Sequence, residues 1–205
     1  TDERLTFDDV LERARQLDFS ENAPIAIQFR RPVYLSAEYV ADFQIAAYYS
    51  SYSDMFDKRV ALGNSSGGQL PIVCDQALVV RNVPVNDGGG LDDTSIMTTR
   101  FCNLNEGNTL RSAFNRMLDV TANYERDAGN TTAVQIWTQG LGGPVNPPWD
   151  FMMALVGTDR QELAQRMDLA REGYRGGRGN GWALGGFTCT RQALWSTNRV
   201  YSENN

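Results

Sequence analysis

Histidine is absent from all 205 residues, and its absence limits the chemistry available to this chain. Without an imidazole, serine–histidine and cysteine–histidine catalysis are excluded within the chain. The one lysine, Lys58, stands in the segment 55–59, which lacks the glycines of a phosphate-binding loop. Schiff-base and phosphate-loop chemistry are therefore not expected, and we assign no catalytic residue.

Carboxylates are the reactive side chains that remain, since the chain has 25 acidic residues. A pair of carboxylates in an apolar pocket can hydrolyse a glycosidic bond without histidine. Glu38, Glu106 and Asp150 stand on less regular segments, and Asp150 follows Trp149, whose ring could stack on a sugar. The alternative hypothesis is thus a histidine-independent enzyme, either a glycan hydrolase or a toxin that uses a dinucleotide.

A Gly/Arg/Trp-rich C-terminal region, about 173–205, holds the residues that we expect to bind a partner. Arg175, Arg178 and Trp182 lie among closely spaced glycines. Arginine and tryptophan are enriched at binding hot spots, and a guanidinium can also hold a phosphate or a carboxylate. The glycines do not complete a dinucleotide-binding or phosphate-loop motif, so the alternative is a plain surface loop.

No metal site and no cofactor is expected. The three cysteines follow none of the spacings of zinc or redox sites, and a zinc site without histidine would need carboxylates. The loop Asp87–Asp93 offers oxygen ligands that suit calcium, although its spacing differs from the twelve-residue helix–loop–helix pattern. The sequence leaves open whether this loop binds calcium.

The cysteines predict one disulfide and one free thiol in an exported protein, periplasmic or secreted. Cys102–Cys189 is the expected pair, because it would tie the Gly-rich tail to the body of the protein. Cys74 follows two apolar residues and is expected to pack in the core. A cytosolic protein with three buried thiols is the alternative.

The net charge of −6 argues against indiscriminate binding to nucleic acid. The charge is uneven, because residues 166–205 carry six arginines and three acids, and all four tryptophans follow residue 136. The longest apolar runs are far shorter than the roughly 18 to 20 residues of a membrane span. The expected partners are other proteins or further copies of this chain, with neither a membrane span nor nucleic acid.

Four helices are expected to position these residues. Thr6 caps a first helix, a tyrosine-rich helix runs from Ser36 to about Met55, and the clearest helix covers 110–124 before Gly129. A fourth helix opens at Thr158, where Gln161 completes a capping box. Its apolar spacing predicts a buried stripe of four residues: Leu163, Met167, Ala170 and Tyr174.

The strands are expected between these helices, without a regular βαβ rhythm. The expected strand segments and apolar runs are 25–29, 71–83, 94–104, 133–138, 151–156 and a stretch up to 190. This order predicts an α+β fold, a single compact domain over 1–205 with about four helices and a mainly antiparallel or mixed sheet.

These observations favour a binding role over catalysis. The predicted function is a non-enzymatic structural or binding subunit of an exported or virion-like multiprotein assembly. Its contacts with partners are expected through the C-terminal Gly/Arg/Trp-rich region. Carboxylates and arginines are the charged groups left to the chain, and they are found more often at partner contacts than in turnover.

Overall fold

The computed structural model describes residues 5–19, 22–36, 42–64, 70, 72, 74, 78–88, 93–175 and 185–203. Four helices lie in this part of the chain: α1 (Phe7–Arg15), α2 (Tyr52–Asn64), α3 (Leu110–Ala128) and α4 (Arg160–Arg175). Seven strands accompany them: β1 (Ala26–Tyr34), β2 (Gln44–Tyr48), β3 (Leu78–Pro84), β4 (Thr94–Leu104), β5 (Ala133–Gly142), β6 (Phe151–Gly157) and β7 (Phe187–Ser202). None of these helices is long and apolar enough to cross a bilayer.

The chain divides into two compact units. Unit 1 comprises Thr1–Pro32, Ala41–Cys74 and Thr197–Asn205, and unit 2 comprises Val33–Val40 and Asp75–Ser196. The strand order is β2-β1-β7 in unit 1 and β7-β4-β6-β5-β3 in unit 2, so that β7 belongs to both. The strands are antiparallel, which confirms the predicted α+β class with four helices. The extent of the predicted domain stays a prediction.

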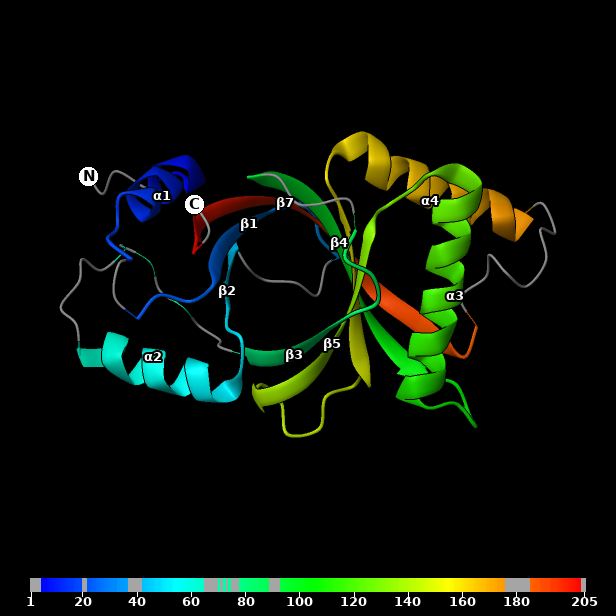
Figure 1. Ribbon diagram of the computed structural model, residues 1–205, viewed down its shortest axis with the longest axis horizontal. Helices are drawn as coiled ribbons and strands as arrows, with labels where there is room; N and C mark the ends of the chain where they lie inside the picture. The colour runs from blue at the N-terminus through cyan, green and yellow to red at the C-terminus, as the bar shows by residue number, and fades with distance from the viewer. Residues whose placement is uncertain are drawn as a thin grey trace. The chain divides into compact units, whose positions relative to one another are not determined.

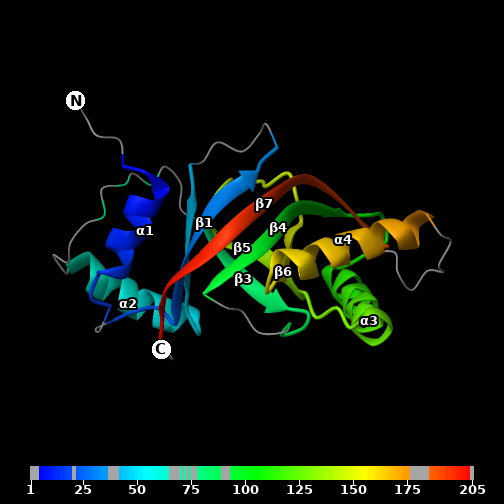
Figure 2. The ribbon, with the colours of Figure 1, turned by 90° about the horizontal axis from the view of Figure 1, so that it is seen from above.

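Unit 2 is built on the chain order β4-α3-β5-β6-α4-β7, which with its strand order is a split βαβ, or ferredoxin-like, motif. Helix α3 contacts β5, and α4 contacts β4 and β6. Figures 1 and 2 show the two helices together on one side of this sheet. The motif occurs with many functions, so it carries no functional conclusion by itself.

Helix α3 is capped at both ends, and its predicted stop at Gly129 is confirmed. The Thr109 hydroxyl accepts a hydrogen bond from the Ser112 amide at 3.1 Å, and the Ser112 hydroxyl accepts one from the Thr109 amide at 2.9 Å. Gly129 closes the helix at a φ of 63°, a left-handed conformation that glycine adopts at little cost. The helix therefore begins and ends where its sequence provides the caps.

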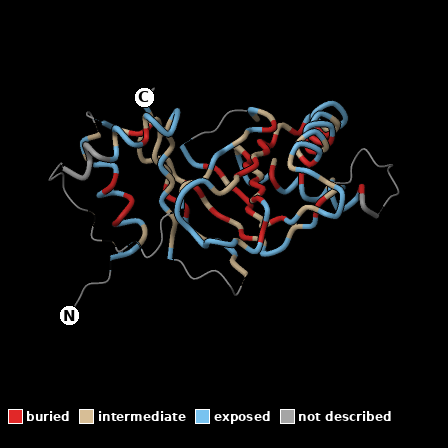
Figure 3. The backbone as a smooth tube through the Cα atoms, turned by 90° about the horizontal axis from the view of Figure 1, so that it is seen from below, coloured by how far each residue is buried: buried red, intermediate tan, exposed pale blue. Residues whose placement is uncertain are grey.

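Both faces of the unit 2 sheet bury apolar side chains, and Figure 3 shows buried residues along its strands. On the helix-covered face, Met117 of α3 packs with Cys102 and Phe151 in one apolar cluster. On the opposite face, Trp137 and Trp195 lie in a second cluster, where the Trp195 indole donates a hydrogen bond to the Thr99 hydroxyl at 2.9 Å. These two tryptophans therefore belong to the core and are not surface anchors.

Unit 1 has a smaller core, formed where α1 covers β1. Thr6 caps α1 as predicted, and Val10 and Ala14 of this helix pack in one cluster with Phe29 of β1. The opposite side of β1 holds a polar contact, in which the Arg30 guanidinium donates to the Tyr48 hydroxyl at 2.6 Å. Strand β2 pairs with β1 in a regular antiparallel register.

The tyrosine-rich helix predicted over 36–55 is wrong in the part that the structure describes. Residues 44–48 form β2, and helix α2 begins only at Tyr52. The Ser51 hydroxyl accepts a hydrogen bond from the Asp54 amide at 3.1 Å, so this serine caps the next helix. The aromatic and β-branched side chains before Ser51 favour a strand over a helix. Pairing with β1 then stabilises that strand.

Candidate functional site

The predicted binding residues are mostly beyond the described part of the chain. Arg175 is the last residue of α4, whose C-terminus favours a cation, and its side chain is not described. Arg178 and Trp182 both lie outside the described residues. Their role in binding therefore stays a prediction.

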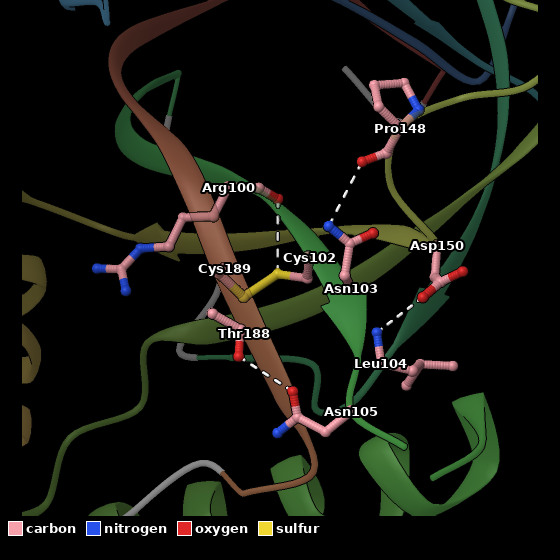
Figure 4. The surroundings of a disulfide bond; sticks show 9 residues. All are labelled: Arg100, Cys102, Asn103, Leu104, Asn105, Pro148, Asp150, Thr188 and Cys189. Atoms are coloured by element: carbon pink, nitrogen blue, oxygen red, sulfur yellow. Dashed lines mark hydrogen bonds between the residues drawn. A yellow bond between two sulfur atoms is a disulfide. The ribbon is translucent and has the colours of Figure 1, made fainter. Parts of the chain in front are cut away.

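The predicted disulfide is confirmed (Figure 4). Cys102 of β4 and Cys189 of β7 are bridged across 87 residues of sequence, with their Cα atoms 4.0 Å apart. Beside the bridge, the Thr188 hydroxyl donates to the Asn105 side chain at 3.0 Å. Cys74 is a free thiol and is exposed, so its predicted packing in the core is wrong.

The candidate acid Asp150 is hydrogen-bonded to the backbone. Its carboxylate accepts a hydrogen bond from the Leu104 amide at 2.7 Å (Figure 4), and its own amide donates to the Cys102 carbonyl at 2.9 Å. These bonds join the end of β4 to the start of β6. Glu106 is exposed in the turn after β4, and Glu38 lies outside the described residues. Only Asp150 and Glu106 of the three candidate acids are thus described, and a paired carboxylate site stays a prediction.

The loop Asp87–Asp93 is only partly described, because residues 89–92 lie outside the described part. Among the residues that the structure describes, no three Cys, Asp or Glu side chains are grouped closely enough to hold a metal ion. Whether this loop takes up calcium therefore stays open.

Helix α4 begins one residue later than predicted. The Asp159 carboxylate accepts hydrogen bonds from the amides of Gln161 and Glu162 at 2.8 and 2.9 Å. The Glu162 carboxylate in turn accepts from the Thr158 amide at 2.8 Å. The predicted cap of Thr158 with Gln161 is thus wrong, because charged carboxylates one residue further along satisfy the free amides of the first turn.

The buried side of α4 agrees with the prediction at Leu163 and differs from it at Met167 and Ala170, while the side chain of Tyr174 is not described. Met167 is 37% exposed and Ala170 is exposed, whereas Arg166 is only 5% exposed. The apolar spacing of this helix would place Met167 inward and leave Arg166 in solvent. The fold therefore turns an arginine towards the interior of unit 2 and a methionine outward.

The guanidinium of Arg166 lies between α4 and α3. Its Cζ is 3.5 Å from the centroid of the Tyr124 ring, and its Nη2 donates to the Thr121 hydroxyl at 3.1 Å. Its Nη1 is buried and has no hydrogen-bond partner among the described residues. Burial lowers the pKa of Arg166 to about 10, and the nearby Tyr124 opposes this shift. At neutral pH the buried side chain is therefore a cation.

A second arginine shares the helix-covered face of this sheet. Arg100 of β4 lies opposite Met153, a member of the cluster under α3, and opposite side chains of an antiparallel pair point to the same face. Desolvation lowers the pKa of Arg100, and its Nε is buried without a hydrogen-bond partner among the described residues. The Thr98 hydroxyl, two residues earlier on the same strand, is likewise buried and unbonded within that set.

Neither of these two arginines has an acidic partner among the described residues. Neither takes part in the salt bridges Lys58–Asp54 and Arg126–Asp127. Buried charges are normally paired, because an unpaired charge in a poorly polar interior costs several kcal/mol. The helix-covered face of unit 2 thus holds positive charge and hydrogen-bond donors that the described chain leaves unmatched.

A different candidate site is the free edge of unit 1, strand β2. Its sequence contains no charge, proline or glycine, and its pairing with β1 has no irregularity. Ile45, which lies opposite Phe29 of the unit 1 core, is 39% exposed, and Ala47 is also exposed. An uncharged, regular edge strand offers its outer backbone groups to another strand.

The free edge of unit 2, strand β3, is protected by comparison. Its register with β5 shifts between Val79 and Val80, Arg81 is exposed in its middle, and Pro84 ends it. A bulge, a charge and a proline are the devices by which proteins prevent further strand pairing. Among the strands that the structure describes, β2 is therefore the edge without these protections.

The sequence prediction missed both sites. Arg166 was overlooked because the apolar spacing of α4 predicts a different buried face. The sequence feature that could have revealed it is its position three residues after Leu163, on the same face of the helix. The β2 edge was hidden by the helix assignment of 36–55.

Comparisons with protein-family models, with curated proteins and with solved structures give no match.

Proposed function

We propose that this protein is a non-enzymatic structural or binding subunit of a multiprotein assembly outside the cytoplasm, and that strand β2 forms its main contact. The observation that carries the proposal is the uncharged and regular edge of β2, with Ile45 and Ala47 exposed. A partner strand laid along this edge would satisfy its outer backbone groups and cover both side chains.

Other features support the same role. The Cys102–Cys189 disulfide fits an oxidising compartment, where such bonds form and persist. On α2 of the same unit, the rings of Tyr52 and Phe56 lie tilted to each other with their centroids 6.2 Å apart, and both residues are about half exposed. Aromatic side chains of this kind suit a partner contact. In this proposal the predicted residues Arg175, Arg178 and Trp182 contribute a second contact.

The test is the molar mass of the purified protein in solution, with variants at the two sheet edges. The wild type is expected to elute as a multiple of the 22.8 kDa chain, or together with a partner from its native extract. Ile45→Lys is expected to give the 22.8 kDa monomer, because the charge would have to be buried at the contact. Asn82→Lys on the exposed edge of β3 is the matched control and should leave the mass unchanged.

A triple variant, Arg175→Ala with Arg178→Ala and Trp182→Ala, measures the share of the C-terminal region. Association that survives Ile45→Lys but is lost in the triple variant would move the contact to that region. Circular dichroism confirms that each variant is folded. A wild type that stays a monomer at all concentrations and retains no partner would contradict the proposal.

A further inference from the structure

We propose that the strand which pairs with the free edge of β2 is β2 of a second copy of this chain, antiparallel to the first and related to it by a twofold axis at Ala46. This inference rests on the proposed contact through β2, and it adds the identity of the partner and the register of the pairing. It follows from the backbone and side chains of β2, whose residues the structure describes in full.

The backbone of β2 determines which residues face a partner. The Tyr48 carbonyl accepts a hydrogen bond from the Ile25 amide at 2.8 Å, so the backbone groups of Tyr48 point towards β1. In an antiparallel pair this orientation alternates from one residue to the next. Ala46 therefore also faces β1, whereas Ile45 and Ala47 turn their amides and carbonyls towards the free edge.

A twofold axis at Ala46 bonds all of these outward groups within the two strands. It places Ile45 opposite Ala47 of the other copy, and each such pair exchanges two backbone hydrogen bonds. An axis at Ile45 would leave Ala47 opposite Phe43, and one at Ala47 would leave Ile45 opposite Tyr49, both outside β2. An axis between two residues would set an outward residue against one that already bonds to β1.

The side chains match this register. On the face of Phe29, the exposed Ile45 of each copy would lie beside the exposed Ala47 of the other, so that a large apolar side chain meets a small one. At the axis, Ala46 would meet its own copy in a non-hydrogen-bonded pair, where the Cα atoms are about 4.5 Å apart. An alanine fits this short distance, whereas a charged side chain would face its own like charge.

The lack of charge around β2 favours a second copy as the partner. Residues 43–53, between Asp42 and Asp54, contain no charged side chain. Each copy has a net charge of −6, so two copies repel each other least where they meet through neutral surface. A charged partner strand would find no ionic partner on β2. The segment therefore suits contact with its own copy.

The test is a disulfide cross-link at the axis, in a Cys74→Ser background that removes the free thiol. In the proposed dimer, Ala46→Cys places its thiol opposite its own copy, at a Cα separation that a disulfide can span. Mild oxidation should convert most of this variant into a covalent dimer of twice the 22.8 kDa chain. A reductant should return the single chain.

Two controls establish the register. Ala47→Cys is the matched variant, because its thiol would lie diagonally from its own copy, with Cα atoms roughly 7 to 8 Å apart, and it should cross-link about 10-fold less. A mixture of Ile45→Cys and Ala47→Cys should form the mixed disulfide, since these residues lie opposite each other in the dimer. Circular dichroism and thiol titration confirm that each variant is folded and has a reactive thiol.

Three results would overturn the inference, and they separate it from the proposed function. A wild type that is a monomer by itself but binds a different protein from its native extract keeps the proposed function and rejects the second copy. Equal cross-linking of Ala46→Cys and Ala47→Cys, with association still lost in Ile45→Lys, rejects the register and keeps β2 as the contact. A wild type that stays a monomer and retains no partner rejects both.

Discussion

Helices α3 and α4 cover the same face of the unit 2 sheet, but they bury different kinds of side chain. Helix α3 turns its apolar residues inward, including Met117, and shields a cluster that contains the disulfide. Helix α4 turns Arg166 inward and leaves Met167 in solvent. The α3 side is therefore built for stability, whereas the α4 side keeps a charge that stability alone does not require.

The largest effect is expected on the α3 side, from loss of the disulfide. Replacing Cys102 and Cys189 by alanine should lower the free energy of unfolding by about 4 to 5 kcal/mol, because the bridge closes a loop spanning 87 residues. Chemical denaturation followed by circular dichroism measures the change. The control is Cys74→Ser at the exposed free thiol, expected to change stability by less than about 0.5 kcal/mol. Equal losses in both proteins would contradict the contribution assigned to the bridge.

Packing under α3 should give the next effect. Met117→Ala is expected to cost about 2 to 5 kcal/mol, because Met117 is completely buried and its removal leaves a cavity. Its neighbour Leu118 is 44% exposed, so Leu118→Ala should cost about 1 kcal/mol or less. Thermal and urea unfolding of the two variants measure this contrast. Similar costs for the pair would mean that α3 is not the apolar helix described.

The α4 side should respond in the opposite direction. Arg166→Met is expected to be as stable as the wild type or up to about 2 kcal/mol more stable, because a buried unpaired charge is removed. Arg171→Met, at an exposed position of the same helix, should stay within about 0.5 kcal/mol. A clear loss of stability in Arg166→Met would contradict the difference between α3 and α4, since it would show that Arg166 stabilises the fold.

The pH dependence of Arg166→Met sharpens the same point. The folded-state pKa of Arg166 is about 10, below its ordinary value, so the unfolded chain keeps this proton to higher pH. The wild type should therefore gain stability relative to Arg166→Met as the pH rises through about 10. Measuring the difference between the two proteins cancels the titration of tyrosines remote from position 166, but not that of Tyr124, whose pKa is raised by burial and lowered by Arg166. A difference that stays constant across this range would contradict the burial of a charged Arg166.

The smallest effect concerns the cap of α4. Asp159→Ala should cost about 1 kcal/mol, because two amides of the first turn lose their acceptor. Gln161→Ala, at the position that the sequence suggests for the capping box, should cost less than about 0.5 kcal/mol. Thermal unfolding distinguishes them. A larger cost for Gln161→Ala would favour the cap predicted from the sequence.

The same contrast explains what could be predicted from the sequence. Strand β4 and helix α3 were predicted correctly, because their pattern, caps and burial agree. The stripe predicted for α4 was right at Leu163 and wrong at Met167 and Ala170, because apolar spacing cannot show that a charged side chain is buried. The 36–55 assignment was wrong in its described part, because Ser51 caps the following helix and β2 depends on pairing with distant β1. The pair Cys102–Cys189 was identified without a structure, whereas both candidate sites required one.

The disulfide has a further consequence for proteolysis. The bridge closes a covalent ring from residue 102 to residue 189, and this ring contains α3, β5, β6, α4 and the segment 176–184. One cut by a protease within the ring opens the backbone but releases no fragment, so the two pieces migrate together until a reductant is added. A nicked molecule therefore keeps β7 covalently attached to β4, and damage inside the ring stays invisible on a non-reducing gel.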